Sequence, residues 1–200
     1  KKKEFEKRLT IGIPDALHLS DDLEFWRHFF DALSIKTVTS KGYAEAVKEG
    51  KKITGAEFCS PLTALHGHVG YLLDKADYVF LPFYLEDKQK TKDVRRQYCY
   101  YTQHAPSLVA DVFTSEKERI LMPLVKYLYN GSHAKVQLYR MLKTVSGRRV
   151  SFRDVSTAYK KALEFKERSL EDLSNQYQRE IADARGISVV LLGRPYTVLS

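Results

Sequence analysis

Short apolar runs and longer amphipathic segments follow one another along the chain, a pattern typical of α/β proteins. The apolar runs lie at residues 9–13, 35–39, 77–81 and 119–122, and each has the length of a strand. Helical periodicity fills the intervals, so the connections are long enough for right-handed crossovers. We therefore predict an α/β fold with a Rossmann-like parallel sheet and flanking helices, in which the first three runs are neighbours.

The amphipathic segments predict the helices. A first helix starts at Ser20-Asp21-Asp22, where acidic groups suit the positive end of a helix dipole. Other segments are expected as a short helix at 43–48, a loop at 50–55, a helix beginning near Pro61, a charged loop or lid at 83–97, and helices at 106–113 and 133–144.

The C-terminal part of the pattern is simpler. A long connecting helix is predicted at residues 151–184, with a length of roughly 50 Å at about 1.5 Å per residue. Ser151 and Asp154 open it in a capping-box-like arrangement. The bare apolar run at 187–192 is typical of a strand that is buried on both faces of a parallel sheet.

These elements divide the chain into four parts. We expect a linker at residues 1–8, an α/β lobe with the candidate site at 9–125, a helical segment at 126–185, and a strand at 186–200. That last strand starts or completes a further α/β unit, so we expect the chain to be a fragment of a longer protein with the long helix as connector.

Composition narrows the class of protein. With 44% hydrophobic residues in 200, the chain can bury a substantial core without disulfides. No apolar run reaches the roughly 18 residues of a membrane helix and no signal peptide opens the chain, so we expect a cytoplasmic protein. The net charge of +8 could attract an acidic ligand. Much of the excess lies in charged runs at 1–3 and 86–96, which are typical of solvated loops, and we expect no nucleic-acid partner.

The stretch from residue 57 to 83 holds most of the candidate chemistry. Cys59 immediately precedes a helix, whose positive end favours the thiolate form that binds metal; a buried, inert cysteine is the other interpretation. Cys99, the second cysteine, follows the charged loop. His66 and His68 point away from each other on a helix, so only one of them could join the two cysteines at a zinc site. A hydrogen-bonded histidine is the alternative.

Proline ends four of the predicted strands, at Pro14, Pro82, Pro123 and Pro195. In a parallel sheet these exits all lie at the carboxyl edge, where open α/β folds bind ligands. Arg194 could meet a phosphate there or pair with a local carboxylate. We see no Walker loop, Ser-His-Asp spacing or acidic pair, and therefore expect no catalysis by this chain alone.

Taken together, several motifs resemble a domain of the CoA enzyme activase family, whose members are related to activators of 2-hydroxyacyl-CoA dehydratases. The motifs are Ile11-Gly12-Ile13-Pro14, Ala16-Leu17, Phe25-Trp26, Phe29-Phe30, Phe58-Cys59-x-Pro61, His66-Gly67-His68, the strand ending at Pro82, and Gly193-Arg194-Pro195-Tyr196. In that family the domain looks like a distant relative of the iron-sulfur subunits of dehydratases and benzoyl-CoA reductases.

The resemblance implies a module of an ATP-driven, CoA-linked redox system that binds, or helps to bind, a 4Fe-4S cluster. We take Cys59, Cys99 and His66 as candidate metal ligands, and Gly12, Pro14, Gly193 and Arg194 as candidate cofactor-binding residues. Two cysteines are too few for the usual four ligands, so the rest of the chain or a partner would supply others. Zinc is a minor alternative.

Two functions remain open. In the first, the module works with ATPase activator domains and an acyl-CoA dehydratase or reductase component, and carries the cluster. In the second, it is a docking domain between the ATPase and the dehydratase, without a cluster.

Overall fold

The computed structural model describes residues 9–87, 96–126, 131–146 and 150–183, and the single positions 186, 189 and 193. Its strands are β1 (Thr10–Ile13), β2 (Lys36–Thr39), β3 (Tyr78–Phe80), β4 (Phe83–Tyr84), β5 (Glu86–Asp87), β6 (Arg96–Gln97), β7 (Ile120–Leu121) and β8 (Leu124–Lys126). Its helices are η1 (Leu17–Leu19), α1 (Leu23–Asp31), α2 (Ala46–Thr54), α3 (Ser60–Leu73), α4 (Tyr100–Val112), η2 (Thr114–Arg119), α5 (Gly131–Val145) and α6 (Phe152–Asp183).

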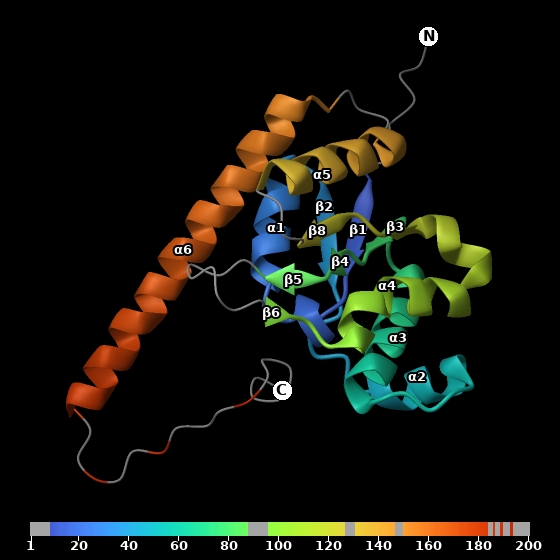
Figure 1. Cartoon of the computed structure of the whole chain (residues 1–200), viewed down its shortest axis with the longest axis horizontal. Coiled ribbons are helices and arrows are strands. Elements are labelled where there is room, and N and C mark those ends of the chain that lie inside the picture. Colours follow the sequence, from blue (N-terminus) through green and yellow to red (C-terminus); the bar gives the residue numbers. More distant parts are fainter. Residues whose placement is uncertain are drawn as a thin grey trace.

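Four of these strands form a parallel sheet in the order β2-β1-β3-β7 (Figure 1). Ile11 of β1 lies opposite Thr37 of β2 on one side and Tyr78 of β3 on the other. The predicted α/β class and the parallel pairing of the first three strands are therefore confirmed. The remaining strands form two small sheets, β4-β8 and β5-β6. Strands β4, β5 and β6 follow β3 in the chain, and β8 follows β7.

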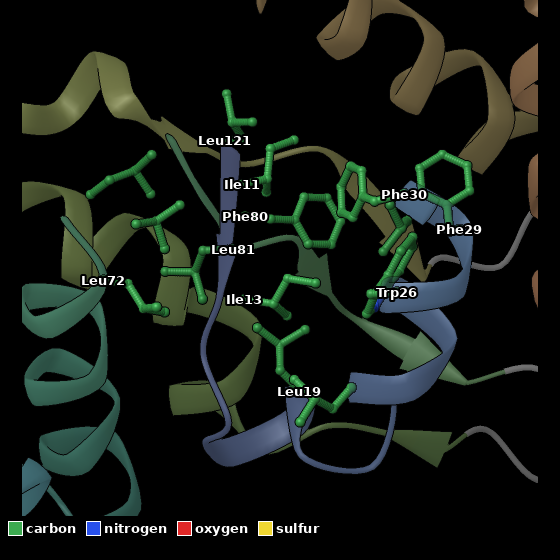
Figure 2. Packing of buried hydrophobic residues seen from close by; sticks show 14 of the residues in the cluster. Ile11, Ile13, Leu19, Trp26, Phe29, Phe30, Leu72, Phe80, Leu81 and Leu121 are labelled. Carbon is green, nitrogen blue, oxygen red and sulfur yellow. The ribbon is translucent and has the colours of Figure 1, made fainter. Parts of the chain in front are cut away.

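Helices cover both faces of the main sheet. Figure 2 shows Leu72 of α3 on one side of β1, and Trp26 and Phe29 of α1 on the other. All three side chains are almost fully buried, as are Ile11 and Ile13 of β1 itself. The last three residues of β1, Ile11 to Ile13, are all buried and carry no polar side chain, which suits a sheet that is covered on both faces.

Helix α2 is longer than the sequence pattern predicts, and the expected loop at 50–55 is wrong. Gly50 lies inside the helix, where a Cβ atom would collide with the backbone carbonyl of Thr63 on α3. Gly67 of α3 meets the carbonyl of Ala46 in the same way. These glycines permit a close helix crossing, and the helix ends only at Gly55, whose φ of +58° is a left-handed C-cap.

Helix α4 also differs from expectation, because it begins at Tyr100 and Pro106 lies inside it. We expected Pro106 to open this helix. The chain instead turns into the helix at Cys99, whose sulfur accepts a hydrogen bond from the backbone N–H of Thr102 at 3.4 Å. Thiol caps are uncommon, so the sequence pattern did not place the start here.

The long C-terminal helix is confirmed as α6, and the predicted helix at 133–144 is confirmed as α5. Ser151 Oγ accepts the N–H of Asp154 at 3.1 Å, while an Asp154 carboxylate oxygen accepts the Ser151 N–H at 3.0 Å. This is the reciprocal capping box that the sequence predicts.

Some predictions lie outside the described residues. They include residues 88–95 of the expected charged loop, whose flanks form β5 and β6, and the strand at 187–192 apart from Val189. Val189 has no regular secondary structure. Within the part of the chain that is described, no helix is both long and apolar enough to cross a membrane.

Candidate functional site

The carboxyl edge of the sheet gathers the starts of several helices. Helix α3 leads into β3, and α4 leads through η2 into β7. Because a helix that connects parallel strands runs antiparallel to them, the N-termini of α3 and α4 lie at the carboxyl edge. Helix α1 follows β1 and also starts there. This edge is the candidate site, as the proline-ended strands predict.

Cys59 and Cys99 are the N-cap residues of α3 and α4. Both have extended backbones, with φ and ψ of −61° and 146° for Cys59 and −60° and 153° for Cys99. Both cysteines are exposed and neither forms a disulfide. Cys99 Sγ also lies 3.1 Å from the hydroxyl of Thr102, whereas the Cys59 side chain makes no capping hydrogen bond. The interpretation of Cys59 as a buried thiol is therefore wrong.

The two helix starts are joined by aromatic contacts. The ring of Phe58, next to Cys59, makes an edge contact with the ring of Tyr101 near Cys99, and their centroids are 6.1 Å apart. Tyr100 and Tyr101 are 79% and 47% exposed. Cys59 adjoins Phe58, and Cys99 lies two residues before Tyr101. The two cysteines are therefore close in sequence to the same pair of contacting rings. That the two sulfurs belong to one metal site stays a prediction.

His66 lies deeper in α3 than the cysteine cap. Its ring is buried and stacks on Phe58 with centroids 5.5 Å apart, and Nδ1–H donates to the Leu62 carbonyl at 2.8 Å. Burial lowers the pKa of His66, although the carbonyls of Leu62 and Leu108 act in the opposite direction. His66 is therefore held in the neutral form, with one nitrogen in a hydrogen bond; metal binding by it stays a prediction.

His68 has a different environment, as expected from its position two residues further along α3. Its ring contacts Tyr43 at 5.9 Å between centroids. Burial lowers its pKa, and the charge of Asp15 opposes this shift.

The described residues contain no group of three or more His, Cys, Asp or Glu side chains that could hold a metal ion. They do offer two accessible thiols on helix starts at one edge, which are suitable but incomplete donors for a cluster or zinc. The fit of this part of the chain to a metal is therefore partial.

The predicted cofactor-binding residues fall in two groups. Gly12 lies within β1, and a Cβ there would come 3.1 Å from Leu72 Cβ, so its small size serves the packing of α3 on the sheet. Pro14 follows β1 and is buried. Gly193 is exposed without regular structure, and Arg194 lies outside the described residues.

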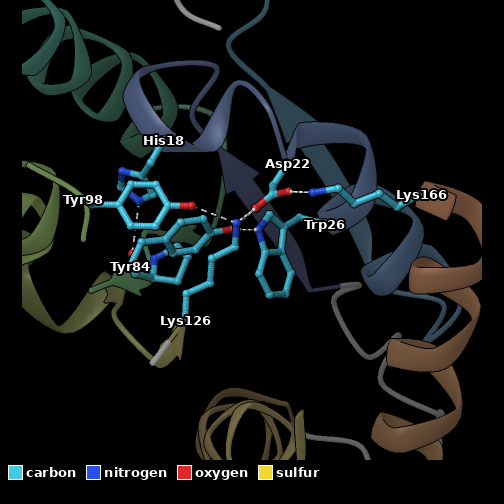
Figure 3. Close-up of polar contacts among 8 residues, drawn as sticks. His18, Asp22, Trp26, Tyr84, Tyr98, Lys126 and Lys166 are labelled. Atoms are coloured by element: carbon cyan, nitrogen blue, oxygen red, sulfur yellow. Dashed lines mark hydrogen bonds and ion pairs between the residues drawn. The ribbon is translucent and has the colours of Figure 1, made fainter. Parts of the chain in front are cut away.

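A second polar group at the same edge is centred on Asp22, the N-cap residue of α1. We call Asp22, Trp26, Tyr84, Lys126 and Lys166 the Asp22 cluster (Figure 3). Tyr84 O–H donates to Asp22 at 2.7 Å, and Trp26 Nε1–H donates to Tyr84 Oη at 2.7 Å. The cluster joins α1, β4, β8 and α6, which are far apart in the sequence.

Two ammonium groups balance the buried carboxylate. Lys126 Nζ lies 2.8 Å from one Asp22 oxygen, and Lys166 Nζ is bonded to the other. Asp22 is only 3% exposed, so burial alone would raise its pKa; the two lysines outweigh this and lower the pKa to about 2. Asp22 therefore stays ionised. Helix α1 begins directly after Asp22, as the sequence predicts, although the Asp22 side chain makes no capping hydrogen bond.

Tyr84 and its neighbours complete this part of the edge. Burial and the adjacent Asp22 charge raise the pKa of Tyr84 well above its usual value, so the phenol remains a hydrogen-bond donor. Lys126 Nζ lies 4.4 Å above the Tyr84 ring and donates to Tyr98 Oη at 3.1 Å. Tyr98 immediately precedes Cys99, so the Asp22 cluster reaches the start of α4.

His18 borders the cluster from η1. Its Nε2–H donates to the Pro82 carbonyl at 3.2 Å, and its ring contacts Tyr84 with centroids 4.6 Å apart. Burial lowers the pKa of His18 to about 4, against the opposing effect of the Pro82 carbonyl. A neutral His18 is thus part of the native edge. Sequence reasoning missed this residue because no local pattern distinguishes it.

The fold and its edge define an α/β domain that presents cysteine-capped helices at the carboxyl end of a parallel sheet. Residues 10–200 match the model of the family described as CoA enzyme activase uncharacterised domain. The chain belongs to this family, which confirms the resemblance seen in its motifs. No curated protein and no solved structure matches the chain.

Proposed function

We propose that this chain is a non-catalytic module of an ATP-driven, CoA-linked redox activase system, in which it binds or helps to bind an iron-sulfur cluster. Membership of the CoA enzyme activase family supports the CoA-linked activase role. The observation that carries the finer proposal is the placement of both cysteines, exposed, as N-caps at one sheet edge. Such positions leave the sulfur atoms accessible to a ligand.

The residues have separate tasks in this proposal. Cys59 and Cys99 supply two sulfur ligands from the N-termini of α3 and α4. A bound cluster supplies one-electron transfer. The remaining ligands come from outside the described residues, from either the rest of the polypeptide or an ATPase activator or dehydratase partner. The neutral His66, whose ring stacks on Phe58, is the third candidate ligand from this chain.

Anaerobic reconstitution with iron and sulfide tests the proposal. We expect the wild-type chain to become brown and to retain iron and sulfide after gel filtration, and we expect Cys59→Ser and Cys99→Ser each to lower the iron content per chain. Tyr100→Ser is the matched control, because it truncates an exposed neighbour and keeps both thiols. Iron retention that is equal in all four proteins contradicts cluster binding at these cysteines, while zinc retained in place of iron assigns them to zinc.

A docking function without a cluster is the second candidate. The exposed rings of Tyr100 and Tyr101 favour it, since aromatic side chains are common anchors at protein interfaces. Colourless protein that binds the ATPase component, and loses that binding in a Tyr100→Ser, Tyr101→Ser double variant, would support docking over cluster binding.

A further inference from the structure

The two halves of α6 have different surroundings. In the first half, Val155, Ala158 and Ala162 are buried, and the Phe165 ring stacks on His28 of α1 with centroids 3.5 Å apart. Lys166 then bonds Asp22. Every residue from 167 to 182 is exposed. In Figure 1 this second half, orange to red, runs past the lobe.

The buried face of α6 continues as an apolar stripe on the exposed half. Leu170, Leu173, Tyr177 and Ile181 follow Ala162 and Lys166 at three- and four-residue spacing, so they lie on one side of the helix. They are 56%, 62%, 51% and 47% exposed. Leu170, Leu173 and Tyr177 also line a shallow groove. Four large apolar side chains in one row are unusual on a solvated helix face.

The chain itself supplies an apolar segment of matching length. Residues 187–192 (ISVVLL) follow α6 after three residues, one of which, Gly186, has a φ of +131° that favours glycine at a change of direction. Six extended residues span about 20 Å, and the helix from residue 170 to 181 spans about 16 Å. Val189 is 78% exposed, so apolar surface is uncovered on both sides.

We propose that residues 187–192 form a strand that runs back antiparallel to α6 and docks on the stripe of Leu170, Leu173, Tyr177 and Ile181. A helix followed by an antiparallel strand is the αβ half of a βαβ unit, and its helix packs on the sheet that the strand enters. The exposed half of α6 is then the cover of a second α/β layer that begins within this chain. This inference does not depend on cluster binding.

Engineered disulfides test the docking. In register, residue 189 lies opposite Tyr177, because two strand residues and four helix residues both span roughly 6 Å. In a background of Cys59→Ser and Cys99→Ser, we expect Tyr177→Cys with Val189→Cys to form an intramolecular disulfide about tenfold faster than Asn175→Cys with Val189→Cys. Asn175 is exposed on the opposite side of α6 and lies only two residues further from Val189 along the chain.

A second pair of variants separates docking from other uses of the stripe. We expect Leu173→Lys to speed thermolysin cleavage within residues 187–192, and Asn175→Lys to leave it unchanged, while both proteins sediment as monomers. Equal disulfide rates in the two cysteine pairs, or equal cleavage in the two lysine variants, would overturn the proposal. So would a wild-type dimer that Leu173→Lys dissociates, because the stripe would then bind a second copy.

Discussion

Three helix N-caps lie at the carboxyl edge, and they fall into two kinds of surroundings. Asp22, which caps α1, is 3% exposed and bonded by Tyr84, Lys126 and Lys166. Cys59 and Cys99, which cap α3 and α4, are exposed. A buried carboxylate whose lone pairs are already used holds neighbouring elements in place, whereas an accessible sulfur can still accept a ligand. The comparison gives the Asp22 side of the edge a structural role, whereas a binding role for the cysteine side stays a proposal.

We expect the largest effect on stability from a substitution that removes the charge of Asp22. Asp22→Asn removes the charge between Lys126 and Lys166 and leaves two ammonium groups beside each other in a mostly buried site. We expect the free energy of unfolding to fall by about 4 kcal/mol, measured by urea denaturation at neutral pH.

Asp21→Asn is the control for this change. Asp21 is the preceding residue, is exposed, and lies in the same turn. Its replacement should alter the free energy of unfolding by no more than about 0.5 kcal/mol. Similar losses in both variants would show that the Asp22 cluster carries no special stabilisation.

The free energy of unfolding, measured as a function of pH, separates the contributions of His18 and Asp22 on this side of the edge. The folded pKa of His18, about 4, lies below its ordinary value of 6.5, so the unfolded chain binds the proton more readily. Stability should fall by up to about 3 kcal/mol as the pH falls from 6.5 to 4. The depressed pKa of Asp22 contributes stability that is present above pH 3.8 and is lost from there down to about pH 2.

His18→Gln should reduce the loss of stability between pH 6.5 and 4. It should leave the loss between pH 3.8 and about 2 unchanged. Part of the slope will remain, because burial also lowers the pKa values of His66 and His68. His104→Gln, at an exposed position in α4, is the matched control and should reproduce the wild-type profile. An unchanged slope in His18→Gln would contradict the burial of a neutral His18.

The sequence predicts the parts of the fold that depend on local patterns. The parallel strands were found because each is a short apolar run between helical segments, and the cap at Cys59 was found because Pro61 marks the first turn of α3. The boundaries of α2 and α4 were missed where tertiary contacts override local preference. Gly50 allows α2 to cross α3 closely, and the Cys99 sulfur starts α4 before Pro106.

The candidate site divides in the same way. Cys59 and Cys99 could be assigned to the carboxyl edge from the order of strands and helices alone. The Asp22 cluster could not, because its hydrogen bond between Asp22 and Lys166 joins residues 144 positions apart, and the helix-start pattern at Asp22 does not point to Lys166. Long-range ion pairs of this kind leave no periodic signal in the sequence.

The smallest expected effect sharpens the cysteine side of the comparison. The Cys99 sulfur accepts the Thr102 N–H, so Cys99→Ala should cost about 1 kcal/mol of unfolding free energy, as for the loss of other N-caps. Cys99→Ser restores an acceptor at the same place and should recover most of this loss. The Cys59 side chain makes no capping hydrogen bond, so Cys59→Ala and Cys59→Ser should have equal stability. Thermal denaturation of the four variants without metal measures both differences.

If Cys59→Ala is as destabilised as Cys99→Ala, then Cys59 also has a structural role. The loss of stability on replacing each cysteine would then not distinguish a capping residue from a ligand. If the expected pattern holds, any loss of iron in Cys99→Ser reports on the sulfur as a ligand, because the helix start is preserved.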